Sequence, residues 1–392
     1  MLQLKDLIQG RLSKTARQTD LEDVDLRKAR RKLRNILKQA LNDEIPTIEE
    51  LSILFSAQGH EIHLLGQVAD VIRERQVGST ITYVVNRNIN FTNVCSNNCL
   101  FCAYSVPPDS KDGYFDISIE NFRKKIEKTY PYQITEVCVQ GGIHPALNFD
   151  TYIEILQNLK GIDPTLHIHA FSPQEITHAA NSIEEDVEEV LREFKKHGLG
   201  SIPGTAAEIL DDNVRKAICP HKLSSAEWIH TIELCHQLGI PTTATILFGH
   251  IEGSHHWVRH LSILRMIQEK THGFTEFIPL PFIAENTQLK QKHSFHKLSN
   301  LDYIKFYAVS RLFLGDLFKN IQTSWVKLGF PMAQITLKAG CNDFGGTLFE
   351  ENITRSAGGV FGQIATPEKF QMSIHRLQRT SCERGTLYNL LC

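Results

Sequence analysis

The chain has 392 residues, of which 42% are hydrophobic and 22% are charged, close to the averages for globular domains. This composition excludes wholesale disorder, and the length allows two domains or one large barrel. The formal net charge of −2 offers no broad positive field to a nucleic-acid backbone. We therefore expect small-molecule partners and no nucleic acid.

The sequence contains no run of about 18 apolar residues, so we predict no transmembrane helix and no membrane partner. The first residues, Met1 to Asp6, carry an early acid and lack the apolar stretch of a secretory signal. The cytoplasm is the expected compartment. Nine cysteines are too few for a disulfide scaffold, and clustered cysteines in a reducing compartment favour metal binding or catalysis.

Residues 1–80 are expected to form a charged helical N-terminal extension. The acidic stretch at 20–25 and the basic stretch at 27–32 are typical of a solvated helix face, with a partner-docking surface as the alternative. From residue 81 onward, short β-branched runs alternate with helical periods, which predicts strands and helices in turn. The predicted strands are 81–90, 136–140, 166–171, 201–203, 242–248, 276–281, 321–326 and a segment before Cys341.

Helix signals occupy the stretches between the predicted strands. A hydroxyl three residues before an acid is a capping-box pattern, and glycine follows many helix ends. We predict helix starts at Ser182, Ser224, Ser299 and Thr366, helix ends at Gly198 and Gly239, and a buried face of Tyr152, Ile155, Leu156 and Leu159. This alternation over about 270 residues predicts an α/β fold of the (βα)8 TIM type, with a doubly wound sheet as the alternative. The barrel is assigned to 81–350 and a C-terminal helical cap to 351–392.

Three cysteines follow the first predicted strand with the spacing C-x3-C-x2-C. Cys95, Cys99 and Cys102 can therefore aim three thiolates from one tight loop at a common point. A structural zinc site would need a fourth ligand, and the next candidates are Cys138 and His144, beyond the start of the next strand. We expect a [4Fe-4S] cluster with three cysteine ligands and one open iron; three buried free cysteines are the alternative.

This spacing, with Phe101 just before the third cysteine, resembles the signature of the radical S-adenosylmethionine (SAM) superfamily. The resemblance implies a full or partial βα barrel, in which the open iron binds SAM and one-electron reduction releases a 5′-deoxyadenosyl radical. It implies that Cys95, Cys99 and Cys102 are the cluster ligands and that Phe101 lies beside the adenine. The paired glycines of Gln140-Gly141-Gly142 suit close approach of backbone to a ligand, and the superfamily uses the corresponding loop for the SAM amino group.

Ionisable residues near other strand ends are further candidates. His169 alternates with His167 on one strand and could hydrogen-bond cofactor or substrate; a satisfied core histidine is the alternative. The resemblance suggests that Glu208 accepts ribose hydroxyl bonds, whereas an acid at a helix N-terminus is the alternative. His250 and Glu252 are candidates for substrate contact or proton transfer.

Longer stretches resemble one subfamily, the tyrosine-using subunit of the synthase that makes 7,8-didemethyl-8-hydroxy-5-deazariboflavin (FO), the chromophore of coenzyme F-420. The likeness runs from about residue 50 to about residue 365. The nearest alternatives are two radical enzymes of futalosine-dependent menaquinone synthesis, dehypoxanthine futalosine cyclase and aminofutalosine synthase. Thr205-Ala206 favours the deazaflavin enzyme. The stretches are 84–93, 140–145, 167–173, 204–210, 274–282 and 342–347.

The resemblance implies that the 4-hydroxybenzyl part of L-tyrosine is joined to 5-amino-6-(D-ribitylamino)uracil, with release of 2-iminoacetate, methionine and 5′-deoxyadenosine. It also implies a one-electron donor and, because the chain has one three-cysteine loop, a separate second FO synthase subunit that is also a radical SAM enzyme. A non-catalytic iron–sulfur electron carrier is the alternative of another class, although such carriers usually use four cysteines. The remaining cysteines are expected to be small buried hydrophobes: Cys138, Cys219, Cys235, Cys341, Cys382 and Cys392.

Overall fold

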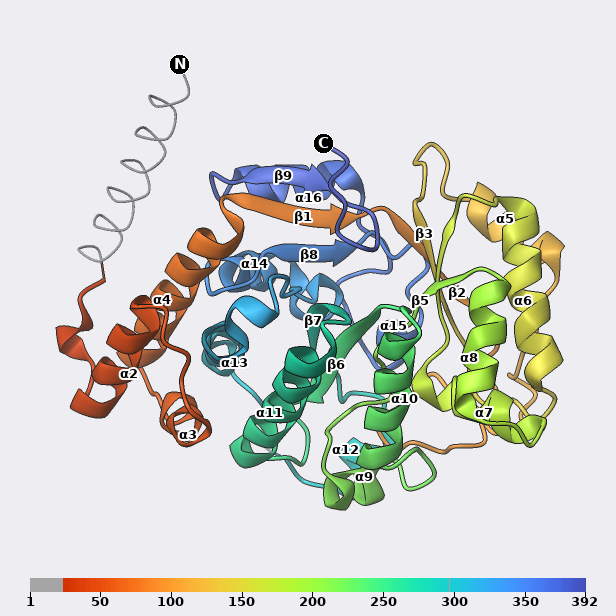
Figure 1. Cartoon of the computed structure of the whole chain (residues 1–392), viewed down its shortest axis with the longest axis horizontal. Helices are drawn as coiled ribbons and strands as arrows, with labels where there is room; N and C mark the ends of the chain where they lie inside the picture. Colours follow the sequence, from red (N-terminus) through yellow and green to blue (C-terminus); the bar gives the residue numbers. More distant parts are fainter. Residues whose placement is uncertain (1–23, 296) are drawn as a thin grey trace.

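A ring of parallel β-strands surrounded by helices forms the centre of the computed structural model, which describes residues 24–295 and 297–392 (Figure 1). One long strand, interrupted at Val85, supplies both β1 and β2, and β2 continues through pairing with β3, β4 and β5. The strands are β1 (Thr80–Val84), β2 (Asn86–Asn90), β3 (Glu136–Gln140), β4 (His167–Ala170), β5 (Leu199–Ser201), β6 (Thr242–Phe248), β7 (Phe274–Pro281), β8 (Asp343–Gly346) and β9 (Thr380–Glu383).

Short bridges and one further strand pair close the ring. A bridge between Ile202 and Thr242 joins β5 to β6, which pairs with β7. Residues 321–322 then bridge to Phe277 in β7 and to Asp343 in β8, and β8 pairs with β1. All of these pairings are parallel, so the predicted TIM-type barrel class is confirmed.

The last two predicted strands are wrong in position. The segment 321–326 contributes only its first two residues to the ring, because helix α14 (Trp325–Leu337) begins before it ends. The strand expected before Cys341 lies after it, as β8, whose sequence Asp-Phe-Gly-Gly has no β-branched residue. Pairing with β1 and with Gln322 on either side defines this strand. Its own composition therefore did not predict it.

Helices cover the outside of the ring. Ser224 and Ser299 form capping boxes and Thr366 caps a helix, as predicted, but Ser182 is wrong, because it ends α7 and the next helix starts after Asp186. The helices are α2 (Arg31–Leu41), α3 (Ile48–Phe55), α4 (His60–Val77), α5 (Ile119–Glu127), α6 (Phe149–Ile162), α7 (Pro173–Ser182), α8 (Val187–Lys196), α9 (Asp212–Ile218), α10 (Ser225–Gln237), α11 (Ser254–Thr271), α12 (Gln288–Lys292), α13 (Asn300–Leu314), α14, α15 (Ile353–Ser356) and α16 (Pro367–His375), with short 3₁₀ turns at Leu26–Lys28 and Gly315–Leu317.

The N-terminal extension is helical from residue 26 to residue 77, and α2, α3 and α4 lie together on one side of the barrel (Figure 1). Leu33, Leu37 and Leu65 are fully buried there, and α4 packs along α13. The basic stretch stays largely at the surface, where Arg27 pairs with Asp25. Residues 20–23 of the acidic stretch lie outside the described residues. Among the described helices none has the length and apolar character needed to cross a bilayer.

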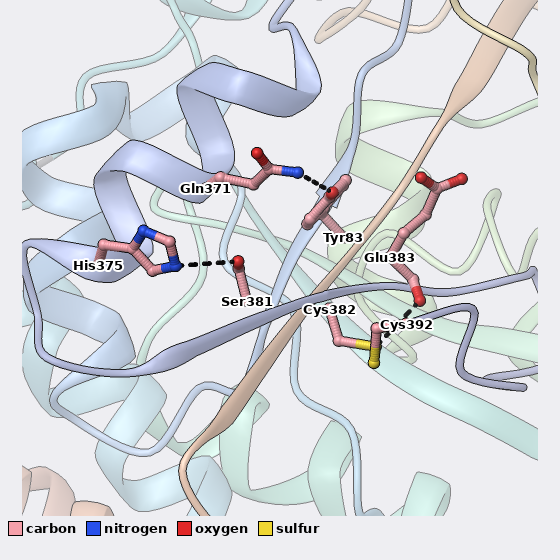
Figure 2. Close-up of a disulfide and its surroundings, with 7 residues drawn as sticks. All are labelled: Tyr83, Gln371, His375, Ser381, Cys382, Glu383 and Cys392. Carbon is pink, nitrogen blue, oxygen red and sulfur yellow. Dashed lines mark hydrogen bonds between the residues drawn. A yellow bond between two sulfur atoms is a disulfide. The ribbon is translucent and has the colours of Figure 1, made fainter.

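The C-terminal segment is only partly the helical cap that we predicted. After α16, which is tied to β1 by a hydrogen bond from Gln371 to Tyr83, strand β9 pairs with β1 on the outside of the ring (Figures 1 and 2). The chain then reverses, with a bridge from Arg384 to Leu390. This reversal brings Cys382 and Cys392 together as a disulfide, which corrects the expectation that both are merely buried hydrophobes.

Candidate active site

The three cysteines of the loop after β2 line one pocket at the carboxyl ends of the barrel strands. The pocket has an empty volume of about 1210 Å³, including the part that opens to solvent, and active sites of such barrels lie at this end. Five of the other predicted site residues line the same pocket: Phe101, Gln140, Gly141, Gly142 and Glu208.

Backbone contacts fix the cysteine loop against the loop after β3. The amide of Ile143 donates to Sγ of Cys95 at 3.3 Å, and the amide of Cys102 donates to the carbonyl of Cys99 at 3.0 Å. Burial raises the pKa of the Cys99 thiol, so binding of a positive metal centre would have to displace its proton.

The donor set of this pocket fits an iron–sulfur cluster with one open iron. Among the described residues, the lining includes three cysteines and neither a histidine nor a fourth cysteine. No group of three or more His, Cys, Asp or Glu side chains in the described ranges stands ready for a single ion. A four-iron cluster held by these three thiolates would keep one iron free of protein ligands.

The two glycines after β3 are packed too tightly for any side chain. A Cβ atom on Gly141 would lie 2.4 Å from the Phe91 ring, and one on Gly142 would lie 2.2 Å from the carbonyl oxygen of Val94 and 2.8 Å from Cβ of Cys95. The absence of a side chain thus allows this loop to press directly on the cysteine loop.

Glu175 is a pocket residue that the sequence reasoning missed. Its carboxylate accepts hydrogen bonds from the amide of Gly141 at 3.0 Å and from the amide of Ser172 at 2.6 Å, and it lines the pocket. Burial raises its pKa to about 7. The Ser-x-x-Glu spacing at 172–175, a capping box at the start of α7, was the available signal.

A buried ion pair forms another part of the lining. Lys222 lies 2.7 Å from Glu208, and its ammonium is 5.3 Å from the centre of the Phe101 ring. Lys327 also lines the pocket, and burial lowers its pKa. Neither lysine belongs to a motif, so no signal in the sequence pointed to them.

His250 and Glu252, the predicted catalytic pair, are not among the residues that line this pocket. Glu252 accepts hydrogen bonds from the amide of His250 at 2.9 Å and from the indole of Trp257 at 2.8 Å, and Nδ1 of His250 lies 2.9 Å from its Oε2. Burial alone would raise the pKa of Glu252, but His250 and the other donors outweigh it and lower this pKa to about 2. The pair therefore holds the loop after β6 outside the cysteine pocket, and its catalytic role stays a prediction.

His169, predicted to bind the cofactor, lies in a second cavity inside the barrel and not in the cysteine pocket. Nδ1 of His169 lies 2.7 Å from Oγ of Ser201, and Nε2 of His167 lies 2.7 Å from the same oxygen. Burial lowers the pKa of His169 to about 4, so its ring is neutral near pH 7. This position does not support direct contact with a cofactor in the cysteine pocket.

Comparisons with known families cover both halves of the barrel. The sequence matches the family described as "Radical SAM superfamily" over residues 89–264 and the family described as "CofH/MqnC C-terminal region" over residues 271–386. The first match contains the cysteine loop, and the second runs from the end of α11 to the tail after β9.

Relatives with similar sequences cover most of the chain. A 5-amino-6-(D-ribitylamino)uracil–L-tyrosine 4-hydroxyphenyl transferase from Archaeoglobus fulgidus is 47% identical over 327 residues, which is 83% of this chain and 93% of the relative. One of the same name from Methanothermobacter thermautotrophicus is 44% identical over 356 residues, 91% of this chain and 96% of the relative.

Solved structures support the fold. Methylornithine synthase (PylB) superposes with a TM-score of 0.70 at 16% identity, covering 88% of this chain and 97% of that one. The [FeFe]-hydrogenase maturase HydG gives 0.69 at 17% identity, covering 93% and 78%. At these identities the likeness extends to the barrel alone.

Proposed function

Because this chain belongs to the 5-amino-6-(D-ribitylamino)uracil–L-tyrosine 4-hydroxyphenyl transferase family of the radical SAM superfamily, we propose that it joins the 4-hydroxybenzyl part of L-tyrosine to 5-amino-6-(D-ribitylamino)uracil. The products are the adduct, 2-iminoacetate, methionine and 5′-deoxyadenosine, and the reaction serves deazaflavin synthesis. The observation that carries the proposal is the convergence of Cys95, Cys99 and Cys102 on one pocket with the Gly141-Gly142 loop and Glu208.

Cys95, Cys99 and Cys102 are the residues that would hold a [4Fe-4S] cluster. When bound, such a cluster supplies one-electron reduction of SAM. The protein's task is then to bind and orient the reactants and to keep water away from reactive species. Hydrophobic residues assist in that exclusion, since Leu247, Leu280 and Phe282 line the same pocket as the cysteines.

Three elements of the pocket suit the parts of SAM. The Gly141-Gly142 backbone stands against the cysteine loop, and Glu175 accepts the Gly141 amide hydrogen, so a ligand amino group can approach this loop. Glu208, held by Lys222, is a charged acceptor suited to ribose hydroxyls. Phe101 lies beside Lys222 and offers a flat face to the adenine.

The reaction also requires partners outside this chain. We infer a one-electron donor and a separate second subunit of FO synthase that closes the deazaflavin ring. We further infer the cytoplasm as the compartment, since Cys95, Cys99 and Cys102 must stay reduced to bind iron, and all three are free thiols.

The experiment compares products from parallel anaerobic incubations of cluster-loaded protein with SAM and dithionite. One tube contains L-tyrosine and 5-amino-6-(D-ribitylamino)uracil, and another contains dehypoxanthine futalosine, because the family of the C-terminal region carries two names. Mass spectrometry should find the tyrosine-derived adduct in the first tube only. Turnover of dehypoxanthine futalosine alone would overturn the proposal.

A further inference from the structure

The tail after β9 closes the barrel at the end opposite the cysteine pocket. Glu136 and Asp343 are the first residues of β3 and β8, so they mark the amino ends of the strands, whereas the cysteine pocket lies at the carboxyl ends. Arg384 and Thr386 of the tail line a cavity inside the barrel together with Glu136. The tail therefore forms part of the floor of this cavity, and we call residues 383–392 the floor segment.

A chain of side-chain contacts fastens the floor segment. Arg384 donates to both carboxylate oxygens of Asp343, at 2.6 and 3.1 Å, and its guanidinium carbon lies 4.0 Å from the centre of the Tyr388 ring. Tyr388 in turn donates a hydrogen bond of 2.7 Å to Glu276. The backbone of Tyr388 has a φ of 64°, which is unfavourable for a bulky residue and persists only where the surroundings impose it. This strain favours release of the segment once its end is free.

The Cys382–Cys392 disulfide ties the end of the floor segment to β9 (Figure 2). The two cysteines are 10 residues apart, so the bond closes a loop that contains Arg384, Thr386 and Tyr388. Cys382 is buried, whereas Cys392 is exposed. Because a cross-link restricts the open state of its loop, loss of a bond across a loop of this length favours opening about a hundredfold.

The disulfide is an exception among the cysteines of this chain. The other seven are free thiols, and the cysteine loop needs reducing conditions to bind iron. In reducing compartments a protein disulfide is usually transient or redox-sensing. We propose that Cys382–Cys392 is a thiol–disulfide exchange site that holds the floor segment in place, and that reduction by a dithiol releases the segment and opens the cavity to solvent. This control is independent of which substrates the protein takes.

The exchange is a balanced two-electron reduction. A thiolate of the dithiol attacks Sγ of Cys392, the exposed sulfur, and the S–S bond breaks with Sγ of Cys382 as the leaving group. Sγ of Cys382 lies 3.2 Å from the carbonyl oxygen of Glu383 (Figure 2), so the thiol formed on protonation has an acceptor in place. The second thiolate of the dithiol then releases Cys392, and the dithiol leaves as a cyclic disulfide. Its two protons pass through water to the two cysteines.

The test compares cluster-loaded wild type with two variants under anaerobic conditions. Cys392→Ser removes the cross-link at an exposed position, and Cys219→Ala, which changes a free buried thiol, is the control. Alkylation of the denatured proteins with and without dithiothreitol shows by mass spectrometry whether the disulfide is present. Hydrogen exchange then measures opening at Gly385 and Leu391, whose amides donate to carbonyls within the floor segment.

We expect wild type and Cys219→Ala to contain the disulfide after incubation with an oxidised dithiol. Dithiothreitol should then speed exchange in their floor segment about tenfold or more, whereas Cys392→Ser should exchange at the fast rate with and without it. Comparison of oxidised and reduced wild type needs no variant, so a misfolded Cys392→Ser would leave the test intact. Absence of the disulfide after oxidation, or equal exchange rates in oxidised and reduced wild type, would overturn the exchange site and leave the proposed function standing.

Opening of the cavity has its own probe. Cys138 is a free thiol that lines the cavity from β3, so its rate of alkylation by iodoacetamide, followed by peptide mapping, reports on access of solvent. After removal of dithiothreitol, reduced wild type should alkylate Cys138 about tenfold faster than oxidised wild type. Equal rates, together with faster exchange in the floor segment, would overturn the opening of the cavity.

Discussion

The ammonium of Lys222 lies 2.7 Å from the carboxylate of Glu208 inside the cysteine pocket. Both side chains are largely buried, with 15% and 11% of their surface exposed. Burial alone would lower the pKa of Lys222, but the Glu208 carboxylate outweighs it and raises this pKa. Lys222 is therefore charged near neutral pH, and it fixes the direction in which Glu208 accepts hydrogen bonds.

Glu208→Gln should weaken SAM binding. The amide keeps the shape but loses the charge, and a hydrogen bond to a charged group is worth about 1.5–3 kcal/mol. We expect the dissociation constant of SAM to rise about tenfold or more, measured by equilibrium dialysis of cluster-loaded protein. The control is Glu233→Gln, which removes a carboxylate from the more exposed pair with Lys270. Equal SAM affinity in Glu208→Gln and wild type would refute the ribose-binding role.

Gly142→Ala should lower the iron content of reconstituted protein. Its new Cβ would collide with the Val94 carbonyl and with Cβ of Cys95, and the cysteine loop would have to move. Gly161→Ala is the control, because a Cβ there meets only Ile119 at 3.7 Å and alanine favours its helix. Iron and sulfide analysis provides the measurement. Full cluster loading in Gly142→Ala would show that the two loops are not coupled.

Glu175 should make stability depend on pH. Its pKa is raised by burial from 4.5 to about 7, so the folded state holds a proton that the unfolded state releases at lower pH. Stability is therefore lost as pH rises from about 4.5 to about 7, by about 3 kcal/mol at most. Glu175→Gln should lose this contribution, which chemical unfolding of both proteins at pH 5 and pH 7.5 would reveal. Parallel pH profiles of the two proteins would contradict the prediction.

Arg384 should be a major stabilising residue of the C-terminal tail. It forms a two-pronged pair with buried Asp343, and breaking a buried pair costs about 3–5 kcal/mol because one charge is left unpaired. We expect Arg384→Met to lower the free energy of unfolding by that amount. Arg192→Met, which breaks the exposed pair with Glu188, should cost less than about 0.5 kcal/mol. Similar losses in the two variants would contradict this prediction.

The cysteine loop and the Gly-Gly loop could be predicted because each is a contiguous motif placed directly after a strand. Alternation predicted a barrel with a doubly wound sheet as the alternative, the resemblance of the cysteine loop implied the barrel, and β3 and β6 have the predicted bounds. Tyr152, Ile155, Leu156 and Leu159 are all fully buried, as their spacing predicted. In these cases local sequence carries the information that the fold uses.

The direction of a side chain at a strand end could not be predicted in the same way. His250 and Glu252 follow β6 as polar residues at an active-site edge do, yet the turn after Phe248 directs Glu252 to backbone amides and to Trp257. Their position depends on the path of the loop, and polarity alone does not encode that path.

Contacts between distant parts of the chain account for the remaining differences. β9 pairs with β1 across about 300 residues, and the Cys382–Cys392 disulfide exists because the tail reverses after Arg384. Lys222 reaches Glu208 and Phe101 from a loop before α10 that has no motif. Such contacts depend on tertiary packing, which a single sequence does not show.

The most direct test of the account is the amount of 5′-deoxyadenosine released by anaerobically reconstituted protein supplied with dithionite, SAM, L-tyrosine and 5-amino-6-(D-ribitylamino)uracil. Wild type and Cys219→Ala, whose buried thiol is not among the pocket-lining residues, should both carry the cluster and release it. Cys95→Ala, Cys99→Ala and Cys102→Ala should lose cluster absorbance and release none while keeping their helical signal. Cluster-loaded wild type that forms no 5′-deoxyadenosine, or an active Cys99→Ala protein, would contradict the account.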